Sequence, residues 1–506
     1  MEQVVAFRPQ AETTQMIRRD FFKTPFAAAG LALGGTPTAS TLAAAAELAK
    51  APGLTRYIAE FIVNTKYEDI PQDVIALGKK TILDGFGLAL AGSASILGPP
   101  LRRYISSLGF AGGKASIIGT TMKVPPRFAA LANGTSIHAD DYDDTGSSLH
   151  VAAPALPPAF ALCETGRRSG KDLMLAFHVG VEVESKIGDA MPARHDGDGF
   201  HTTGTIGAFG SAAACARLLG LNAQQAAYAL GVAASQASGI RRNHGSMTKA
   251  FHAGHAGESG SAAADLASFG WTAADDVLES PLGFYQAAGG AFEPAAIVGR
   301  LGRPWMFASP GDLIKRFPCG TIQQSVMDAT LRLIAQHDIR ATSVDRAEVT
   351  GNQANINTLF RHRPMTGLEA KFSMEFAVAI LLLERKAGLE HFTDAVVQRA
   401  DVQDLVARVR YVVDPDTGKA GGFQAGLAEA ATLKVFMKDG RVLSTRTEPA
   451  KGDPRNPMSY EEVADKFRGN AAFAKWPRQK AESVITLVQS LEREPNMDRL
   501  TAAVTG

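Results

Sequence analysis

A run of carboxylates flanked by two histidines is the part of this sequence best suited to chemistry. Four aspartates fall within the five positions 140–144, with His138 before them and His150 after them. Carboxylates this close raise one another's pKa unless cations or hydrogen bonds compensate. Such crowding is common in active sites, where it tunes groups to exchange protons near neutral pH. Two plainer interpretations stay open, a solvated acidic loop and aspartates that cap neighbouring helices.

The spacing of possible ligands argues against a metal site. Counted from Asp141, Gly146 falls at the sixth position of a calcium loop, but Ala152 occupies the twelfth, where a bidentate glutamate is needed. The three cysteines lie far apart, and there is no Cys-x-x-Cys or His-x-x-x-His pair. We therefore expect neither a metal nor any other cofactor.

Two further segments carry groups that suit an active site. His201 lies in GFHTTGT, residues 199–205, where a histidine at a helix start can be held by polar partners, or can merely cap the helix. Lys249 lies in MTKAFHAGHAG, residues 247–257, just before a glycine-punctuated helix whose N-terminus favours negative charge. A solvent lysine at the end of a loop is the alternative.

The elements that must position these groups are mainly helical. Apolar residues recur at helical spacing from Leu54 onward, and Pro71 sits where a helix could begin. Alternating apolar residues predict short strands around 344–349, 409–413 and 433–437. Asp439-Gly440 is a good hairpin turn signal, and helical spacing returns after Pro454.

The sequence thus predicts a mainly α protein, with a large all-helical domain and a smaller inserted α/β domain. The predicted boundaries are a helical domain over 47–307, an α/β domain over 308–447, and C-terminal helices over 448–506 that return to the helical domain. Its length of 506 residues favours more than one core. Balanced charge, 52 basic against 51 acidic residues, gives no support for nucleic-acid binding.

Residues 1–46 do not resemble domain material. RRDFFK, residues 18–23, resembles a twin-arginine export signal and is followed by a mild apolar stretch. That stretch is too weak and too interrupted by glycine and proline for stable membrane insertion. We expect export to the periplasm in folded form, with a cytoplasmic protein as the alternative.

Several motifs, in order, carry a family resemblance. They are NGTSIHADDYDDT at 133–145, GFHTTGT at 199–205, MTKAFHAGHAG at 247–257, KRFPCG at 315–320 and RHRPMTGLEAKFSMEF at 361–376. Together they resemble the MmgE/PrpD family, which includes 2-methylcitrate dehydratase, cis-aconitate decarboxylase and iminodisuccinate epimerase. The resemblance implies a helical domain with an inserted lid domain. The small-residue helices agree with the homodimer that it also implies.

The resemblance implies a small polycarboxylate substrate that loses a proton next to a carboxylate. The candidate catalytic residues are Asp141, Thr145, His150, His201 and Lys249. The candidate substrate-binding residues are Lys315, Arg363, Lys371 and His252. Fixed cations would stabilise the carbanion, and a neutral imidazole is a suitable base near pH 7. We expect the catalytic residues to line one pocket between the helical domain and the lid.

Three positions depart from the family pattern. Many relatives have histidine at the position of Gln324, and the cis-aconitate decarboxylases have histidine at Gly320 and tyrosine at Phe376. We therefore expect a cofactor-independent, dehydratase-like lyase that decarboxylates cis-aconitate poorly. Epimerisation of a dicarboxylate by the same carbanion chemistry, or carboxylate binding without catalysis, are the alternatives.

Overall fold

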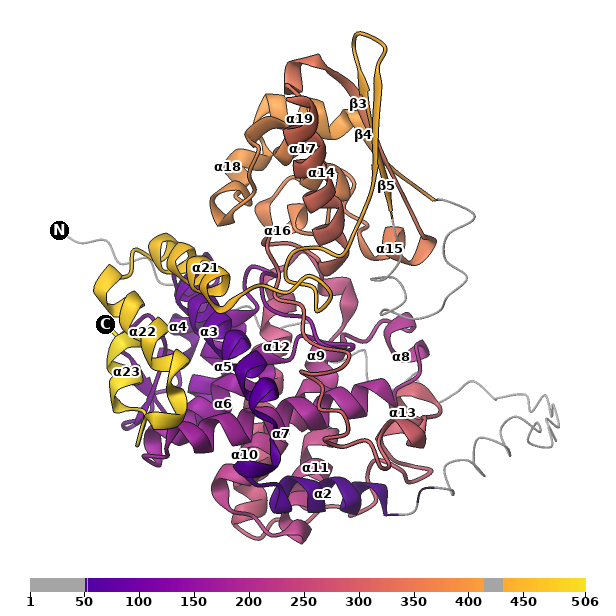
Figure 1. Cartoon of the computed structure of the whole chain (residues 1–506). Helices are drawn as coiled ribbons and strands as arrows, with labels where there is room; N and C mark the ends of the chain where they lie inside the picture. Colours follow the sequence, from indigo (N-terminus) through magenta and orange to yellow (C-terminus); the bar gives the residue numbers. More distant parts are fainter. Residues whose placement is uncertain (1–50, 52, 414–430) are drawn as a thin grey trace, which may run out of the picture. The chain divides into compact units, whose positions relative to one another are not determined.

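The computed structural model describes residues 51, 53–413 and 431–506 of the chain (Figure 1). The predicted export signal, residues 1–46, lies outside the described residues. The first helical part comprises α2 Leu54–Asn64, α3 Gln72–Ala94, α4 Gly98–Ser107, α5 Pro126–Ile137, α6 Ala152–Thr165, α7 Gly170–Asp189, α8 Arg194–Gly197, α9 Thr202–Thr205, α10 Gly207–Leu219, α11 Ala223–Gln236, α12 Met247–Ser268 and α13 Phe284–Gly289. A short ribbon, β1 Ala115–Ser116 and β2 Lys123–Val124, interrupts it.

The later part of the chain alternates helices and strands. Its elements are α14 Gln324–His337, β3 Val344–Gly351, α15 Gln353–Thr358, α16 Gly367–Ala370, α17 Met374–Glu384, α18 Asp394–Val397, α19 Ala400–Arg408, β4 Val409–Val413, β5 Thr432–Met437 and β6 Val442–Arg446. The chain then ends in α21 Tyr460–Phe473, α22 Arg478–Gln489 and α23 Asp498–Val504. The mainly helical character expected from the sequence is confirmed.

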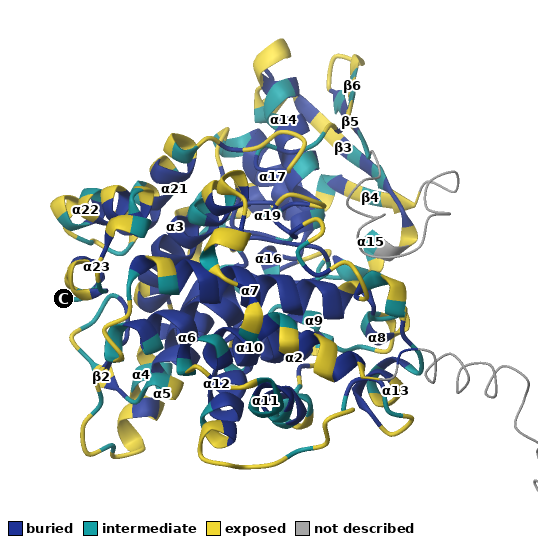
Figure 2. Ribbon diagram, turned by 60° about the horizontal axis from the view of Figure 1, so that its bottom comes forward, coloured by how far each residue is buried: buried dark blue, intermediate teal, exposed yellow. Residues whose placement is uncertain are grey.

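Buried apolar side chains form two large clusters. The larger draws on residues from Ala51 to Ile314 and again on residues from Met458 to Val504. The second draws on residues from Phe317 to Met437. Because α21 to α23 pack into the first cluster, the second core is built from a segment enclosed within the sequence of the first. Figure 2 shows α6, α7 and α10 almost wholly in the buried colour.

The second core is built on a four-stranded sheet in the order β4-β3-β5-β6. β3 pairs with β4 in parallel and with β5 antiparallel. β5 and β6 form the hairpin predicted at Asp439-Gly440, where Gly440 has φ +86, a conformation that glycine adopts without strain. The strands expected near residues 344, 409 and 433 are therefore confirmed.

Glycine allows α5 and α12 to approach very closely. A Cβ added at Gly134 would lie 2.9 Å from Gly254 Cα, and one added at Gly254 would lie 2.2 Å from Thr135 Oγ1. No larger residue fits at either position without moving a helix. This contact is important for the site because α5 leads into the acidic run and α12 carries Lys249 in its first turn. Lys249 thus lies inside the helix, not in the loop before it as the sequence suggested.

A buried ion pair ties the C-terminal helices to the same region. Lys466 Nζ of α21 donates to Asp84 Oδ2 of α3 at 2.9 Å and to the carbonyl oxygen of Tyr142 at 2.8 Å. It also lies 4.0 Å from the centroid of the Tyr142 ring. Burial raises the pKa of Asp84 to about 6, although Lys466 opposes the shift.

Within residues 53–413 and 431–506, no single helix has the length and hydropathy of a membrane span. The helices α3 and α4 reach that criterion only as a pair, and they are bent by 82° with respect to each other.

Lys466→Met should destabilise the protein by about 3–5 kcal/mol, because it leaves a buried carboxylate without its cation. The folded pKa of Asp84 then rises further above its unfolded value of 3.8. The folded variant therefore takes up a proton on Asp84 more readily as the pH falls. Its loss of stability relative to wild type should thus be smaller at pH 5 than at pH 8. Urea denaturation at the two pH values measures this difference.

The double variant Asp84→Asn/Lys466→Met, which removes both charges, is the control and should be more stable at pH 8 than Lys466→Met. An equal loss for Lys466→Met at both pH values would contradict the assignment of a buried charge.

Candidate active site

The acidic run is a buried loop between α5 and α6. His138 is the residue that ends α5, and Val151 immediately precedes α6. Asp141, Asp143 and Asp144 are all buried, so the interpretation as a solvated loop is wrong for them. Asp141 has φ +50, a left-handed conformation that aspartate tolerates better than most residues. The loop therefore holds carboxylates inside the protein, where each requires partners.

Asp144 caps the start of α6, as one of the sequence-based interpretations of the acidic run predicted. Its Oδ2 accepts a hydrogen bond from the Val151 amide at 2.9 Å, and its Oδ1 accepts one from the Ala152 amide at 3.2 Å. Burial, with Asp312 and Asp143 adding to it, raises the pKa of Asp144 well above its ordinary value. One of the four aspartates therefore anchors the start of α6.

Asp141 is the carboxylate that two ammonium groups neutralise. Lys249 Nζ donates to Asp141 Oδ1 at 2.8 Å, and Lys315 Nζ donates to the same oxygen at 2.9 Å. Lys315 also donates to the Asp141 carbonyl oxygen at 2.9 Å. Burial alone would raise the pKa of Asp141, but the two ammonium groups outweigh it and hold the pKa well below its usual range. Asp141 is therefore a permanent anion at neutral pH.

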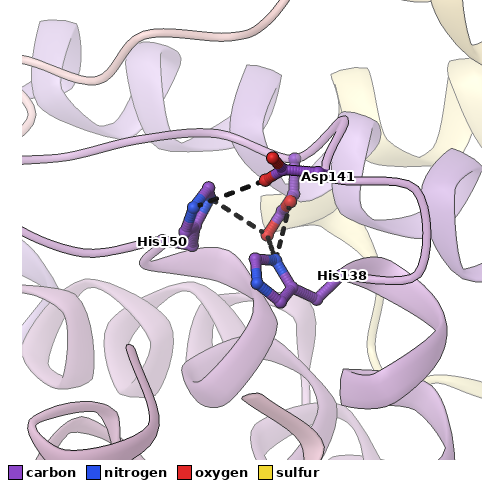
Figure 3. Close-up of side chains that lie close together, drawn as sticks. His138, Asp141 and His150 are labelled. Atoms are coloured by element: carbon purple, nitrogen blue, oxygen red, sulfur yellow. Dashed lines mark hydrogen bonds and ion pairs between the residues drawn. The ribbon is translucent and has the colours of Figure 1, made fainter. Parts of the chain in front are cut away.

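His150 is oriented as a neutral base. Its Nδ1 lies 2.7 Å from the Asp144 carbonyl oxygen, which can only accept, so Nδ1 carries the hydrogen and Nε2 carries the lone pair. Burial lowers the pKa of His150 well below its ordinary value, although Asp143 opposes the shift. His150 Nε2 lies 3.7 Å from Asp141 Oδ1 (Figure 3). A proton arriving on Nε2 would thus lie next to a fixed carboxylate.

His138 and Asp143 form a second buried pair that the sequence analysis did not assign. His138 Nδ1 lies 2.8 Å from Asp143 Oδ2, and Nε2 has no hydrogen-bond partner among the residues that the structure describes. Burial alone would raise the pKa of Asp143, but the His138 ring holds it below its usual value. The rings of His138 and His150 are 4.4 Å apart (Figure 3). The one signal in the sequence was the position of His138 directly before the aspartates.

His201 and His252 are also buried next to this pair. His201 Nδ1 lies 3.1 Å from His252 Nδ1, and the His201 ring stacks on His138 at a centroid distance of 5.7 Å. His201 immediately precedes α9, but its side chain makes no capping hydrogen bond, so capping is not its role. Burial lowers the pKa of His201 well below its ordinary value and that of His252 to about 4. Both rings are therefore neutral at pH 7.

Residues from the second core close over the loop. Thr145 Oγ1 lies 2.8 Å from Thr321 Oγ1, and Lys371 Nζ donates to Asp140 Oδ1 at 3.0 Å. Arg363 is exposed, and no hydrogen bond or ion pair joins it to another residue in the described part of the chain. Of the nine predicted site residues, all but Arg363 therefore lie in or against one cluster.

The three positions that depart from the family pattern have structural surroundings of their own. Gln324 Oε1 accepts hydrogen bonds from the amides of Arg316 and Phe317, so Gln324 fixes the segment that carries Lys315. The Phe376 ring is buried in the second core, 5.2 Å from the ring of Phe392. The Gly320 amide donates to the Lys371 carbonyl oxygen at 3.0 Å, which brings this glycine to the site's edge.

Four side chains in the cluster are of kinds that bind metals. Ligand atoms of His138, Asp141, Asp143 and His150 lie within 4.8 Å of one another, a grouping that sequence spacing did not reveal. Asp141 Oδ1 already accepts from two ammonium groups, however, and a dication there would face Lys249 and Lys315 at close range. The donor set is therefore better suited to holding protons than to holding a metal ion.

His150 should be neutral between pH 6 and 8, with hydrogen on Nδ1 and none on Nε2. The reasons are the 2.7 Å contact to a carbonyl oxygen and the burial of the ring. Long-range proton–nitrogen NMR of histidine-labelled protein, assigned with His150→Gln, distinguishes the tautomers. A resonance that titrates near pH 6.5, like that of an exposed histidine, would contradict the assignment.

Comparison with known proteins adds an independent observation. The sequence profile of the MmgE/PrpD N-terminal domain matches residues 56–296, and that of the MmgE/PrpD C-terminal domain matches residues 317–493. The human protein named cis-aconitate decarboxylase is 29% identical over 474 residues, covering 90% of this chain and 95% of its own length. The mouse protein of that name is 28% identical, covering 90% and 93%.

A protein of the same name from Aspergillus terreus is 27% identical over 87% of this chain and 94% of its own length. The two profiles together account for both cores and most of the cluster. The chain belongs to the MmgE/PrpD family.

Proposed function

We propose that this protein is a cofactor-independent lyase that removes a proton next to a carboxylate of a di- or tricarboxylate. The observation that carries the proposal is the arrangement around His150. Its Nε2 lone pair faces Asp141 at 3.7 Å, and two ammonium groups hold Asp141 ionised. A base that is neutral before the reaction and stabilised after it is suited to proton abstraction near pH 7.

The chemistry follows from where charge develops. When the C–H bond breaks, His150 Nε2 takes the proton and the electron pair moves onto the substrate carboxylate. Lys249 and Lys315 are buried cations beside the base. They therefore stabilise the negative charge that develops on the substrate carboxylate. In a dehydration the electron pair then returns from the carboxylate, a carbon–carbon double bond forms and the hydroxyl group leaves as water with the proton that His150 took up, which restores the neutral imidazole.

The relatives support a polycarboxylate substrate. The proteins named cis-aconitate decarboxylase form the same kind of carbanion if carbon dioxide is lost in place of a proton. We propose dehydration over decarboxylation because Gly320 and Phe376 carry neither the imidazole nor the hydroxyl that the family resemblance implies for decarboxylases. Epimerisation, in which a proton returns to the opposite face, is the alternative that uses the same base.

We infer that substrate entry requires movement, because Thr321 and Lys371 contact residues of the acidic loop. A cavity of about 300 Å³ lies against α3, α4 and the residues just after α21, and another of about 420 Å³ lies at the β5–β6 turn. Neither is lined by a residue of the cluster. We infer that the contacts of Thr145 with Thr321 and of Lys371 with Asp140 separate when substrate enters. Homodimer formation and export remain predictions from the sequence.

Proton NMR in heavy water tests the reaction directly. Hydroxy- and amino-polycarboxylates are incubated with the enzyme, with and without a chelator, and spectra report proton exchange, elimination and epimerisation together. We expect exchange next to a carboxylate and elimination from a hydroxy acid, both insensitive to the chelator. Exchange without elimination would favour the epimerase, and no exchange with any acid would leave only a carboxylate-binding protein.

His150→Ala should lower turnover about a hundredfold or more, because it removes the proton acceptor. Thermal unfolding should change little by comparison, since the ring lies at the edge of the loop and not in the apolar core. His337→Ala, which removes an exposed imidazole on α14, is the control and should keep wild-type turnover. Near-normal turnover by His150→Ala would rule out His150 as the base.

A further inference from the structure

His244 is a buried imidazole that the proposed reaction does not use. It lies between Arg241–Asn243 and the start of α12, and only 7% of its surface is exposed. Its Nε2 has no hydrogen-bond partner among the described residues. Buried polar atoms in native proteins are normally paired, because an unpaired one loses its water without compensation. A ligand group that bonded to Nε2 would remove this cost.

The ring of His244 adjoins the base cluster. It meets the His201 ring edge-on at 4.9 Å and stacks on the Phe372 ring at 5.4 Å. Lys249 Nζ lies 5.3 Å from the centroid of the same Phe372 ring. His244 and Lys249 therefore both pack against the Phe372 ring, and Lys249 also donates to Asp141.

A second unused donor approaches from the other core. Arg361 donates from Nη2 to the His244 carbonyl oxygen at 3.5 Å, and its Nε has no hydrogen-bond partner among the described residues. A Cβ added at Gly245, where φ is +85, would lie 3.2 Å from Arg361 Nε, so the guanidinium group packs on this glycine. Another nitrogen of Arg361 pairs with Glu369 at 3.2 Å. The two unpaired nitrogens thus belong to adjoining residues of different segments.

Charge balance explains why a substrate would need these donors. Asp141 and Asp143 offset Lys249 and Lys315, so the inner cluster has no surplus cation for a polyanion. The carboxylate next to the departing proton can approach Lys249 and Lys315. Any further carboxylate must find polar partners beyond them, and on the Phe372 side His244 and Arg361 each have one nitrogen without a hydrogen-bond partner among the described residues.

We propose that His244 binds the distal carboxylate of the substrate through Nε2 and, together with Arg361, makes the enzyme selective for acids with at least two carboxylates. This inference deepens the proposed function and rests on it for the substrate class. It assigns His244 to substrate selection, not to proton transfer.

Binding of non-reacting probes separates this role from catalysis. The probes are succinate, tricarballylate and butyrate, which is succinate with a methyl group in place of one carboxylate. Their dissociation constants are measured by calorimetry or NMR titration. His244→Phe keeps a ring on Phe372 and removes the nitrogen, whereas His244→Gln keeps a hydrogen-bonding nitrogen at similar reach. His255→Phe, on α12 and stacked on Phe251 at 5.3 Å, is the matched control.

We expect His244→Phe to weaken the binding of succinate and tricarballylate by about tenfold or more. This is the loss of affinity typical of a hydrogen bond to a charged group. The dissociation constant of butyrate should change less than twofold. His244→Gln should recover most of the lost affinity for the two polycarboxylates, and His255→Phe should bind all three probes as wild type does. Arg361→Gln should weaken the same two acids. If His244→Phe does not fold by circular dichroism, Arg361→Gln still carries the comparison.

Unchanged succinate binding by His244→Phe would overturn the subsite, as would an equal loss for butyrate. A wild-type protein that binds none of the probes at millimolar concentration would overturn it too. If wild type binds succinate in a manner dependent on His244 but exchanges no protons, the subsite stands and the proposed lyase activity fails. If wild type exchanges protons and His244→Phe binds as wild type does, only the subsite fails.

Discussion

The pairing of one buried carboxylate with two buried ammonium groups is the interaction on which the candidate site depends. Asp141 lies in a loop with two other buried aspartates, and such crowding would favour protonation of all of them. Lys249 and Lys315, both on Oδ1, reverse this for Asp141, and the His138 ring does so for Asp143. Asp144 takes the opposite course, because burial and the nearby carboxylates of Asp312 and Asp143 raise its pKa more than the Val151 amide lowers it. Neighbouring residues of one type thus acquire different charges from their surroundings.

That pairing requires close helix packing and contact between the two cores. Lys249 comes within reach because glycines let α5 and α12 approach until side chains larger than hydrogen no longer fit. Lys315 belongs to the segment that joins the first core to the second, and Gln324 fixes this segment by its backbone. Lys466, on the C-terminal helix α21, donates a hydrogen bond to the backbone of the same loop. Four regions of the chain therefore meet at one loop, and a change in any of them alters the same electrostatic balance.

The histidines illustrate how burial selects a protonation state. His150, His201 and His252 have lowered pKa values chiefly because burial disfavours the imidazolium. Neutral rings beside fixed cations can accept protons and take part in anion binding. They add nothing to the repulsion between a polyanionic substrate and the aspartates of the cluster. This combination, more than the presence of any one residue, supports the proposed removal of a proton next to a carboxylate.

The sequence by itself determined the helical and strand regions, the hairpin at Asp439-Gly440, the family, and eight residues that meet at the loop. These follow from local periodicity, turn chemistry and motif order, which are properties of short segments. Only the tertiary structure decided that Asp144 caps α6 while Asp141 stays ionised, and that His138 and Asp143 pair. It also decided that His244 has a nitrogen without a hydrogen-bond partner among the described residues and that Arg363 is exposed. The partners of Asp141 are 108 and 174 residues distant in the chain, and pKa values depend on such long-range contacts and on burial. Spacing along the sequence carries no measure of either.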